Sequence, residues 1–217
     1  MNTQEPFVIT ISRELGSGGR TLGKKLAAQL GVRFSDKDLI ESLREKYGLS
    51  TYEIEKVKGK KRNWLSDMLD IVAPLPNNGA LISSQLPTGI RISQPKSEEI
   101  FQAESEILHA IAAEGSCVIA GRSGFYVFKD HPNKLNIFIQ APMEERIKRV
   151  MKKQGLSRTE AETVIKSVDE SRETFVKKFA GVSRYDCRNY DLVLNVGNMS
   201  DEEAILCILK YIKGVSR

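Results

Sequence analysis

Residues 7–23 constrain the fold of this chain more than any other segment. They run Phe-Val-Ile-Thr-Ile-Ser-Arg-Glu-Leu-Gly-Ser-Gly-Gly-Arg-Thr-Leu-Gly. The β-branched residues at 7–12 predict a strand, the glycines predict a tight loop, and the apolar spacing from about Arg20 to Leu30 predicts a helix. A strand, a glycine loop and a helix in this order gather backbone N–H groups around a phosphate at the helix N-terminus.

The loop departs from the usual phosphate-loop pattern, G-x-x-x-x-G-K-[ST]. If Gly18 is the second glycine of that pattern, Arg13 occupies the position of the first. Gly19 then replaces the lysine, and Arg20 replaces the serine or threonine. A plain tight turn is the alternative, but arginines at both ends favour phosphate binding. The residues that we expect to bind phosphate are Arg13, Gly16, Ser17, Gly18, Gly19, Arg20 and Thr21.

The composition is typical of one soluble domain. The chain is 41% hydrophobic and 28% charged, and its length of 217 residues is enough to bury a core without disulfides. No apolar run approaches the roughly 20 residues needed to span a membrane, and no signal segment precedes the first strand. Three widely spaced cysteines without a C-x-x-C pair predict free thiols and a cytoplasmic protein.

The charge favours a small anionic partner. The net charge is +5, and residues 141–190 contain twelve Lys/Arg against eight Asp/Glu. A second basic cluster at 56–62 is typical of a solvated helix end. Few aromatic residues alternate with these cations, which argues against nucleic acid and for small phosphates. The sequence leaves open whether the chain forms a homo-oligomer.

Five short β-branched segments predict an α/β fold. They are separated by helical patterns, which is typical of buried parallel strands in βαβ units and of a three-layer domain. Ser and a later carboxylate predict helix starts at Ser35–Asp38, Ser157–Glu160 and Ser200–Glu203. The predicted strands are 7–12, about 32–35, 117–121, 135–140 and 191–196, and two of the predicted helices are 142–153 and about 157–179.

Residues 73–97 interrupt this pattern between the second and third predicted strands. They contain four of the seven prolines, together with Asn77-Asn78-Gly79 and Gly89. Such a density of proline and glycine prevents a long helix and favours turns. An insertion that closes over a ligand and a simple disordered decoration fit the segment equally well.

Two more candidate site residues follow the ends of predicted strands. Arg122, with Ser123 beside it, comes after the third strand, where the ligand crevice of such sheets lies and where a guanidinium can bind phosphate with two hydrogen bonds. Asp36 comes after the second strand and either orients a substrate or is simply an acid in the first turn of a helix. Asp38 is interpreted as a capping residue.

Arg172 lies on the apolar stripe of the helix at about 157–179, between Val168 and Phe175. A charge on that face needs a partner, which is either a carboxylate of the protein or an anionic ligand. Arginines before and after this helix could converge on the same place, although helix-face arginines are usually solvated. They are Arg146, Arg149, Arg184 and Arg188.

Several reaction types have no support in the sequence. Neither His109 nor His131 has a cysteine or carboxylate at metal-ligand spacing, and no hydrolase elbow is present. The third predicted strand contains no acidic residue for magnesium. Positioning and charge stabilisation remain, and phosphoryl transfer needs little else.

With these residues assembled, the chain resembles the cytidylate kinase-like family of P-loop nucleoside monophosphate kinases over nearly its whole length. The resemblance rests on an ordered set of segments rather than on any single one. They are Ile-Thr-Ile-Ser-Arg-Glu-Leu-Gly-Ser-Gly-Gly-Arg-Thr (9–21), Phe-Ser-Asp-Lys-Asp-Leu-Ile (34–40), Gly-Arg-Ser-Gly (121–124), Ile-Phe-Ile-Gln-Ala-Pro-Met-Glu-Glu-Arg (137–146), Arg-Glu-Thr-Phe-Val-Lys-Lys-Phe (172–179) and Tyr-Asp-Leu-Val-Leu-Asn (190–195).

The resemblance implies one P-loop kinase domain with a five-stranded parallel sheet. Its core would be 1–42, 101–145 and 189–217, with a helical acceptor-side insertion at about 43–100 and a lid at about 146–188. It implies transfer of the γ-phosphoryl group of ATP, with Mg²⁺, to CMP or dCMP.

The resemblance also assigns roles within the site. Residues 16–21 would hold the donor phosphates, with the Thr21 hydroxyl nearest the metal. Asp36 and Arg122 would face the acceptor, and Arg172 would reach from the lid with Arg184 or Arg188. The loop lacks the lysine of the family pattern, and either Arg20 or Arg13 could compensate, since a guanidinium binds phosphate well.

Three functions therefore remain open. The first is an ATP-dependent nucleoside monophosphate kinase, with Arg20 and Arg172 as its catalytic residues. The second is a nucleotide-binding protein that retains the fold without turnover, or a kinase for another small acceptor. The third, a nucleic-acid-binding module that uses the basic lid, has the least support.

Overall fold

The computed structural model of the protein describes residues 1–36 and 97–215. Its sheet has five strands, all parallel, in the order β2-β3-β1-β4-β5. This confirms the predicted α/β class and places every predicted strand within one or two residues. The strands are β1 (Val8–Arg13), β2 (Arg33–Ser35), β3 (Cys117–Ala120), β4 (Lys134–Gln140) and β5 (Leu192–Asn195).

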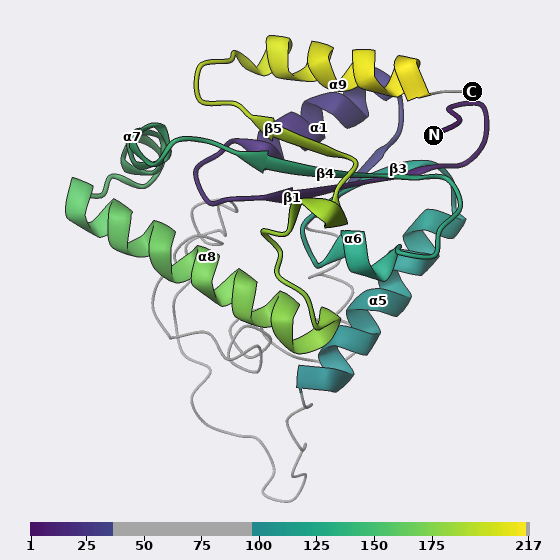
Figure 1. The fold of residues 1–217 in the computed structure, drawn as a ribbon, viewed down its shortest axis with the longest axis horizontal. Coiled ribbons are helices and arrows are strands. Elements are labelled where there is room, and N and C mark those ends of the chain that lie inside the picture. The colour runs from purple at the N-terminus through teal and green to yellow at the C-terminus, as the bar shows by residue number, and fades with distance from the viewer. Residues whose placement is uncertain (37–96, 216–217) are drawn as a thin grey trace, which may run out of the picture.

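Helices cover both faces of the sheet and give the predicted three layers. Helices α1 and α9 lie on one face, and α5, α6 and α8 lie on the other, while α7 lies beyond the arrowhead of β4 (Figure 1). The helices are α1 (Gly19–Leu30), α5 (Ser97–Ala113), α6 (Gly124–Val127), α7 (Met143–Gln154), α8 (Arg158–Ala180), the 3₁₀ turn η1 (Cys187–Asn189) and α9 (Asp201–Val215).

The core follows the strand pattern. Ile9, Ile11 and Ile137 are fully buried and pack toward Leu26 of α1 and Ile208 of α9. A second cluster joins α5 and α6 to the opposite face of the sheet, and a third joins α7 to α8 beneath the glycine loop. Continuous apolar strands are needed because helices cover the central strands on both sides.

Strand β5 differs from the prediction that all strands are buried. Leu192 and Leu194 are half-buried against the first cluster, but Val193 and Asn195 are exposed. The reason is its place at the edge of the sheet, where the described residues cover only one of its faces.

Two predicted helix starts are confirmed. Ser157 and Glu160 form a reciprocal capping box at α8. At α9, the Ser200 hydroxyl accepts from the Glu203 backbone N–H, and the Glu203 carboxylate accepts from the Ser200 N–H. The predicted cap at Ser35–Asp38 lies partly outside the described residues. Residues 37–96, which include most of the predicted insertion and nearly all of the segment 73–97, also lie outside them. Along 1–36 and 97–215, no helix is long and apolar enough to cross a membrane.

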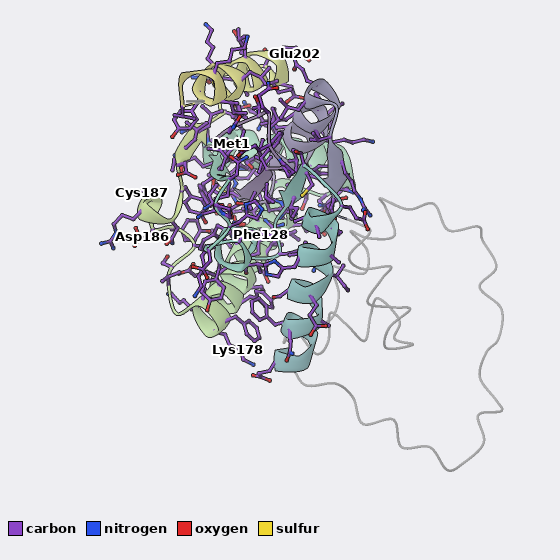
Figure 2. All side chains as sticks on the ribbon, turned by 90° about the vertical axis from the view of Figure 1, so that its right-hand side faces the viewer. Met1, Phe128, Lys178, Asp186, Cys187 and Glu202 are labelled. Atoms are coloured by element: carbon purple, nitrogen blue, oxygen red, sulfur yellow. The ribbon has the colours of Figure 1, made fainter. Side chains whose placement is uncertain are left out.

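The three cysteines are free thiols, as predicted. Cys117 lies buried in β3, and burial raises the pKa of its thiol to about 11, whereas Cys187 is exposed on η1 (Figure 2). At pH 8 only about one thousandth of Cys117 is then thiolate, the reactive form. Iodoacetamide at pH 8 should therefore label Cys187 and spare Cys117 until the chain is unfolded, as measured by peptide mass spectrometry. Equal labelling rates in the folded protein would contradict the buried position of β3.

Candidate active site

The glycine loop connects β1 to α1, as predicted. Gly16 and Gly18 have φ of 81° and 86°, a conformation that side chains rarely adopt. A Cβ at Gly16 would lie 2.8 Å from the Arg146 carbonyl oxygen, so the loop needs glycine there for packing as well. Helix α1 has neither a side-chain cap nor an acidic residue in its first turn. Its positive end is therefore left for an anion.

Side chains of helices α7 and α8 hold the loop in place through hydrogen bonds to its backbone. Arg146 Nε donates to the Leu15 carbonyl at 2.8 Å, and Arg149 Nη1 donates to the carbonyls of Gly16 and Ser17 at 3.4 and 3.0 Å. Leu15 N–H donates to Asp169 at 3.0 Å. The loop therefore has a defined shape before any ligand binds.

Asp169 joins the loop to the arginines around it. Its buried carboxylate pairs with Arg146, with Arg172 at 3.4 Å and with Arg184 at 3.5 Å. Arg146 also pairs with Glu14 at 3.3 Å. A buried carboxylate shared by three arginines holds their side chains in place.

Arg172 and Arg184 converge on the end of β1. Each donates to the Arg13 carbonyl, Arg172 at 3.1 Å. Arg184 is 3% exposed and lies over the rings of Phe138 and Tyr185. Burial, and then the neighbouring Arg184, lower the pKa of Arg172 to about 10, so this guanidinium remains charged at neutral pH.

The Arg13 side chain crosses the carboxyl edge of the sheet between two glycines. A Cβ at Gly19 would lie 2.6 Å from Arg13 Cβ, and one at Gly121 would lie 1.8 Å from Arg13 Nη1. Burial, and then Arg172, Arg122 and Arg184, lower the pKa of the Arg13 guanidinium well below its usual value. Four arginines therefore gather where β1 and β3 end.

The acceptor-side candidates lie at the same edge. Asp36 follows β2 and forms an ion pair with Arg20 Nε, and Arg122 follows β3 and pairs with the buried Glu104 at 3.2 Å. Arg122 and Ser123 both have left-handed backbones, with φ of 57° and 53°. Backbone strain of this kind persists where the surroundings fix it, often at binding sites.

Other predicted residues lie apart from this cluster. Arg188 pairs with Asp186 on η1, and its side chain is 86% exposed; Figure 2 shows Asp186 at the periphery of the molecule. Thr21 is exposed in the first turn of α1. Arg146 is buried beneath the loop rather than beside Arg13.

Two residues that shape the site, Asp169 and Glu104, were not predicted. Asp169 lies three positions before Arg172 on the same helix face, so spacing could have identified it. Arg149 was among the arginines that could converge near this helix, and the structure places it against the loop carbonyls of Gly16 and Ser17. Glu104 lies on α5, far along the chain from Arg122, and no local pattern signals their contact.

A parallel α/β sheet with a glycine loop after its first strand and cations at its carboxyl edge defines the P-loop kinase fold. A solved structure of a shikimate kinase from Bacteroides thetaiotaomicron has this fold, with a TM-score of 0.54 at 15% identity over 95% of this chain and 98% of that one. An uncharacterised protein from Eubacterium ventriosum has a TM-score of 0.67 at 22% identity, over 95% of this chain and 98% of that one.

The sequence model of the cytidylate kinase-like family matches residues 8–198, and the chain belongs to this family. A protein of Ignicoccus hospitalis named cytidylate kinase is 28% identical over 94% of this chain and 98% of its own. Another of that name, from Sulfurisphaera tokodaii, is 24% identical over 95% of each chain.

Proposed function

We propose that the protein transfers the γ-phosphoryl group of ATP to a nucleoside monophosphate, with CMP or dCMP as acceptor. The observation that most supports this proposal is the gathering of Arg13, Arg122, Arg172 and Arg184 beside the glycine loop. Phosphoryl transfer places several negative charges in one spot and needs cations around them. The relatives named cytidylate kinase, which match nearly full length, support the acceptor.

The donor phosphates would bind at the loop. The uncapped N-terminus of α1 and the backbone of residues 16–21 suit a phosphate chain. Among the described residues, no group of three or more potential metal ligands occurs. Mg²⁺ would then be held by the nucleotide phosphates together with the Thr21 hydroxyl, which suits an ion that keeps most of its water. When bound, it would neutralise charge on the phosphates.

The acceptor would bind on the β2 and β3 side of the same edge. Arg122 is positioned for its phosphate, and Asp36 and Ser123 for polar groups of the nucleoside. The Ser123 hydroxyl is buried and has no partner among the described residues, so it is available to a ligand. Residues 43–100 would form the acceptor-side insertion of this single domain.

Arg20 and Arg172 would stabilise the transferring group, with Arg184 as a further arginine of the lid region at 146–188. In this arrangement, Arg172 and Arg184 exchange contacts with the Arg13 carbonyl and Asp169 for contacts with phosphate oxygens. The exchange keeps both guanidinium groups paired in each state, which limits the cost of moving buried charge.

A nucleotide-binding protein without turnover is the second candidate. The specific observation for it is Gly19 in the place of the lysine. Loss of one such charge-stabilising group typically lowers the rate by about 10²–10³.

An ATP-consumption assay with Mg²⁺ and a panel of nucleoside monophosphates tests the proposal. We expect ADP formation that depends on the acceptor, with CMP or dCMP the best, and a lower rate in Arg20→Ala. Nucleotide binding without turnover on any acceptor would reject the kinase. A rate unchanged in Arg20→Ala would reject only the role of Arg20.

A further inference from the structure

We propose that Arg13, at the end of β1, supplies the cation that the loop lacks and that its guanidinium contacts the terminal phosphate of the donor during transfer. This deepens the proposed function and rests on it. The lysine of the usual pattern would come from the start of α1. Here the charge would come from the strand that precedes the loop.

The first support is the path of the Arg13 side chain. Gly19 and Gly121, far apart in the sequence, both lack the Cβ that would collide with it, at 2.6 Å from its Cβ and 1.8 Å from its Nη1. The two glycines thus form a passage that leads the side chain from the loop to the turn after β3. Gly19, which occupies the position of the lysine, therefore leaves the space that the Arg13 side chain fills.

The second support is charge. Each neighbouring arginine has a carboxylate partner: Arg20 has Asp36, Arg122 has Glu104, and Arg172 and Arg184 share Asp169. No described residue forms a hydrogen bond or ion pair with the Arg13 guanidinium. The Asp36 carboxylate raises the pKa of Arg13 but is itself paired with Arg20, so the Arg13 charge is little compensated and gains from an added anion.

The third support is pre-organisation. Gly19 and Gly121 confine the Arg13 side chain, and this confinement does not depend on the partners of Arg172 and Arg184. A cation fixed in this way needs little reorganisation when charge develops beside it. Arg20, in contrast, would have to leave Asp36 before it could reach the donor.

The step is a simple displacement. An oxygen of the acceptor phosphate forms a bond to the γ-phosphorus of ATP, while the bond from that phosphorus to the bridging oxygen breaks and ADP leaves with the electron pair. Arg13 donates hydrogen bonds to the oxygens of the transferring group and forms no covalent bond. The ligand class at this cluster is therefore a polyphosphate chain.

Binding of inorganic tripolyphosphate, measured by isothermal titration at two salt concentrations, tests the contact apart from catalysis. We expect Arg13→Met to weaken binding at least tenfold. Arg158→Met, an exposed arginine at the start of α8 paired with Glu144, is the matched control and should bind as the wild type does. Wild-type affinity in Arg13→Met would overturn the proposal, even if the protein proves to have no kinase activity.

Kinetics provides the second readout. We expect kcat to fall by about 10²–10³ in Arg13→Met, as for other lost charge-stabilising donors, with a smaller change in the acceptor KM. Arg13→Lys should recover part of kcat, and Arg20→Ala should lose less than Arg13→Met. If Arg13→Met fails to fold by circular dichroism, Arg13→Lys and Arg13→Gln are compared instead. A kcat within threefold of wild type in any folded variant without the positive charge would overturn the proposal.

Discussion

An Asp169→Ala variant should lose about 3–5 kcal/mol of its free energy of unfolding, as expected when one partner of a buried ion pair is removed. The Asp169 carboxylate is 7% exposed and faces Arg146 and Arg184, which are 4% and 3% exposed. It also accepts the Leu15 N–H of the glycine loop. Removing it leaves two buried guanidinium groups with less compensation and frees the loop from α8. Urea denaturation followed by circular dichroism measures the loss.

The neighbouring Glu170 provides a matched control. It lies on the same helix but is exposed. Glu170→Ala should change the free energy of unfolding by no more than about 0.5 kcal/mol, as surface substitutions do. If both variants lose the same free energy of unfolding, the ion pairs of Asp169 do not stabilise the fold.

An Arg172→Met variant should lower kcat for phosphoryl transfer by about 10²–10³, because the site loses a charged donor to the transferring group. Arg172 contacts the Arg13 carbonyl and Asp169 in the structure, and its pKa of about 10 keeps it charged at pH 7. Methionine preserves most of the apolar contact of the side chain. Initial rates at saturating ATP with varied CMP measure kcat and KM separately.

The control for this second experiment is Lys166→Met, on the exposed face of the same helix. Lys166 pairs with Glu162 at the surface, and its side chain is 64% exposed. The Lys166→Met variant should retain the kcat of the wild type within about twofold. A normal kcat in folded Arg172→Met would show that α8 provides structure rather than charge to the site.

Much of the fold follows from local sequence patterns. The three central strands, β3, β1 and β4, were predictable because parallel strands that are covered on both faces form continuous apolar runs. The starts of α8 and α9 were predictable because Ser157 and Ser200 each have a carboxylate three positions later. The burial of β5 was predicted incorrectly, since its sequence resembles that of a central strand and only the strand order makes it an edge.

The site was predictable only in part. The spacing of Arg172 between Val168 and Phe175 predicted an inward charge that needs a carboxylate or an anion, and Asp169 is such a carboxylate. The contact of Arg13 with Gly121 depends on strand pairing between distant segments, so no local pattern reveals it. The pairing of Arg20 with Asp36 is equally tertiary, because it requires the start of α1 and the end of β2 to lie side by side.

The most direct test of the proposed transfer is a ³¹P NMR time course of the wild-type protein with ATP, Mg²⁺ and CMP. We expect the γ-phosphate signal of ATP to disappear while the signals of ADP and CDP grow in equal amounts, with no inorganic phosphate formed. The same mixture with Arg13→Met should remain nearly unchanged over that time. Release of inorganic phosphate without CDP, or no loss of ATP in the wild type, would contradict transfer to the acceptor at the arginine cluster.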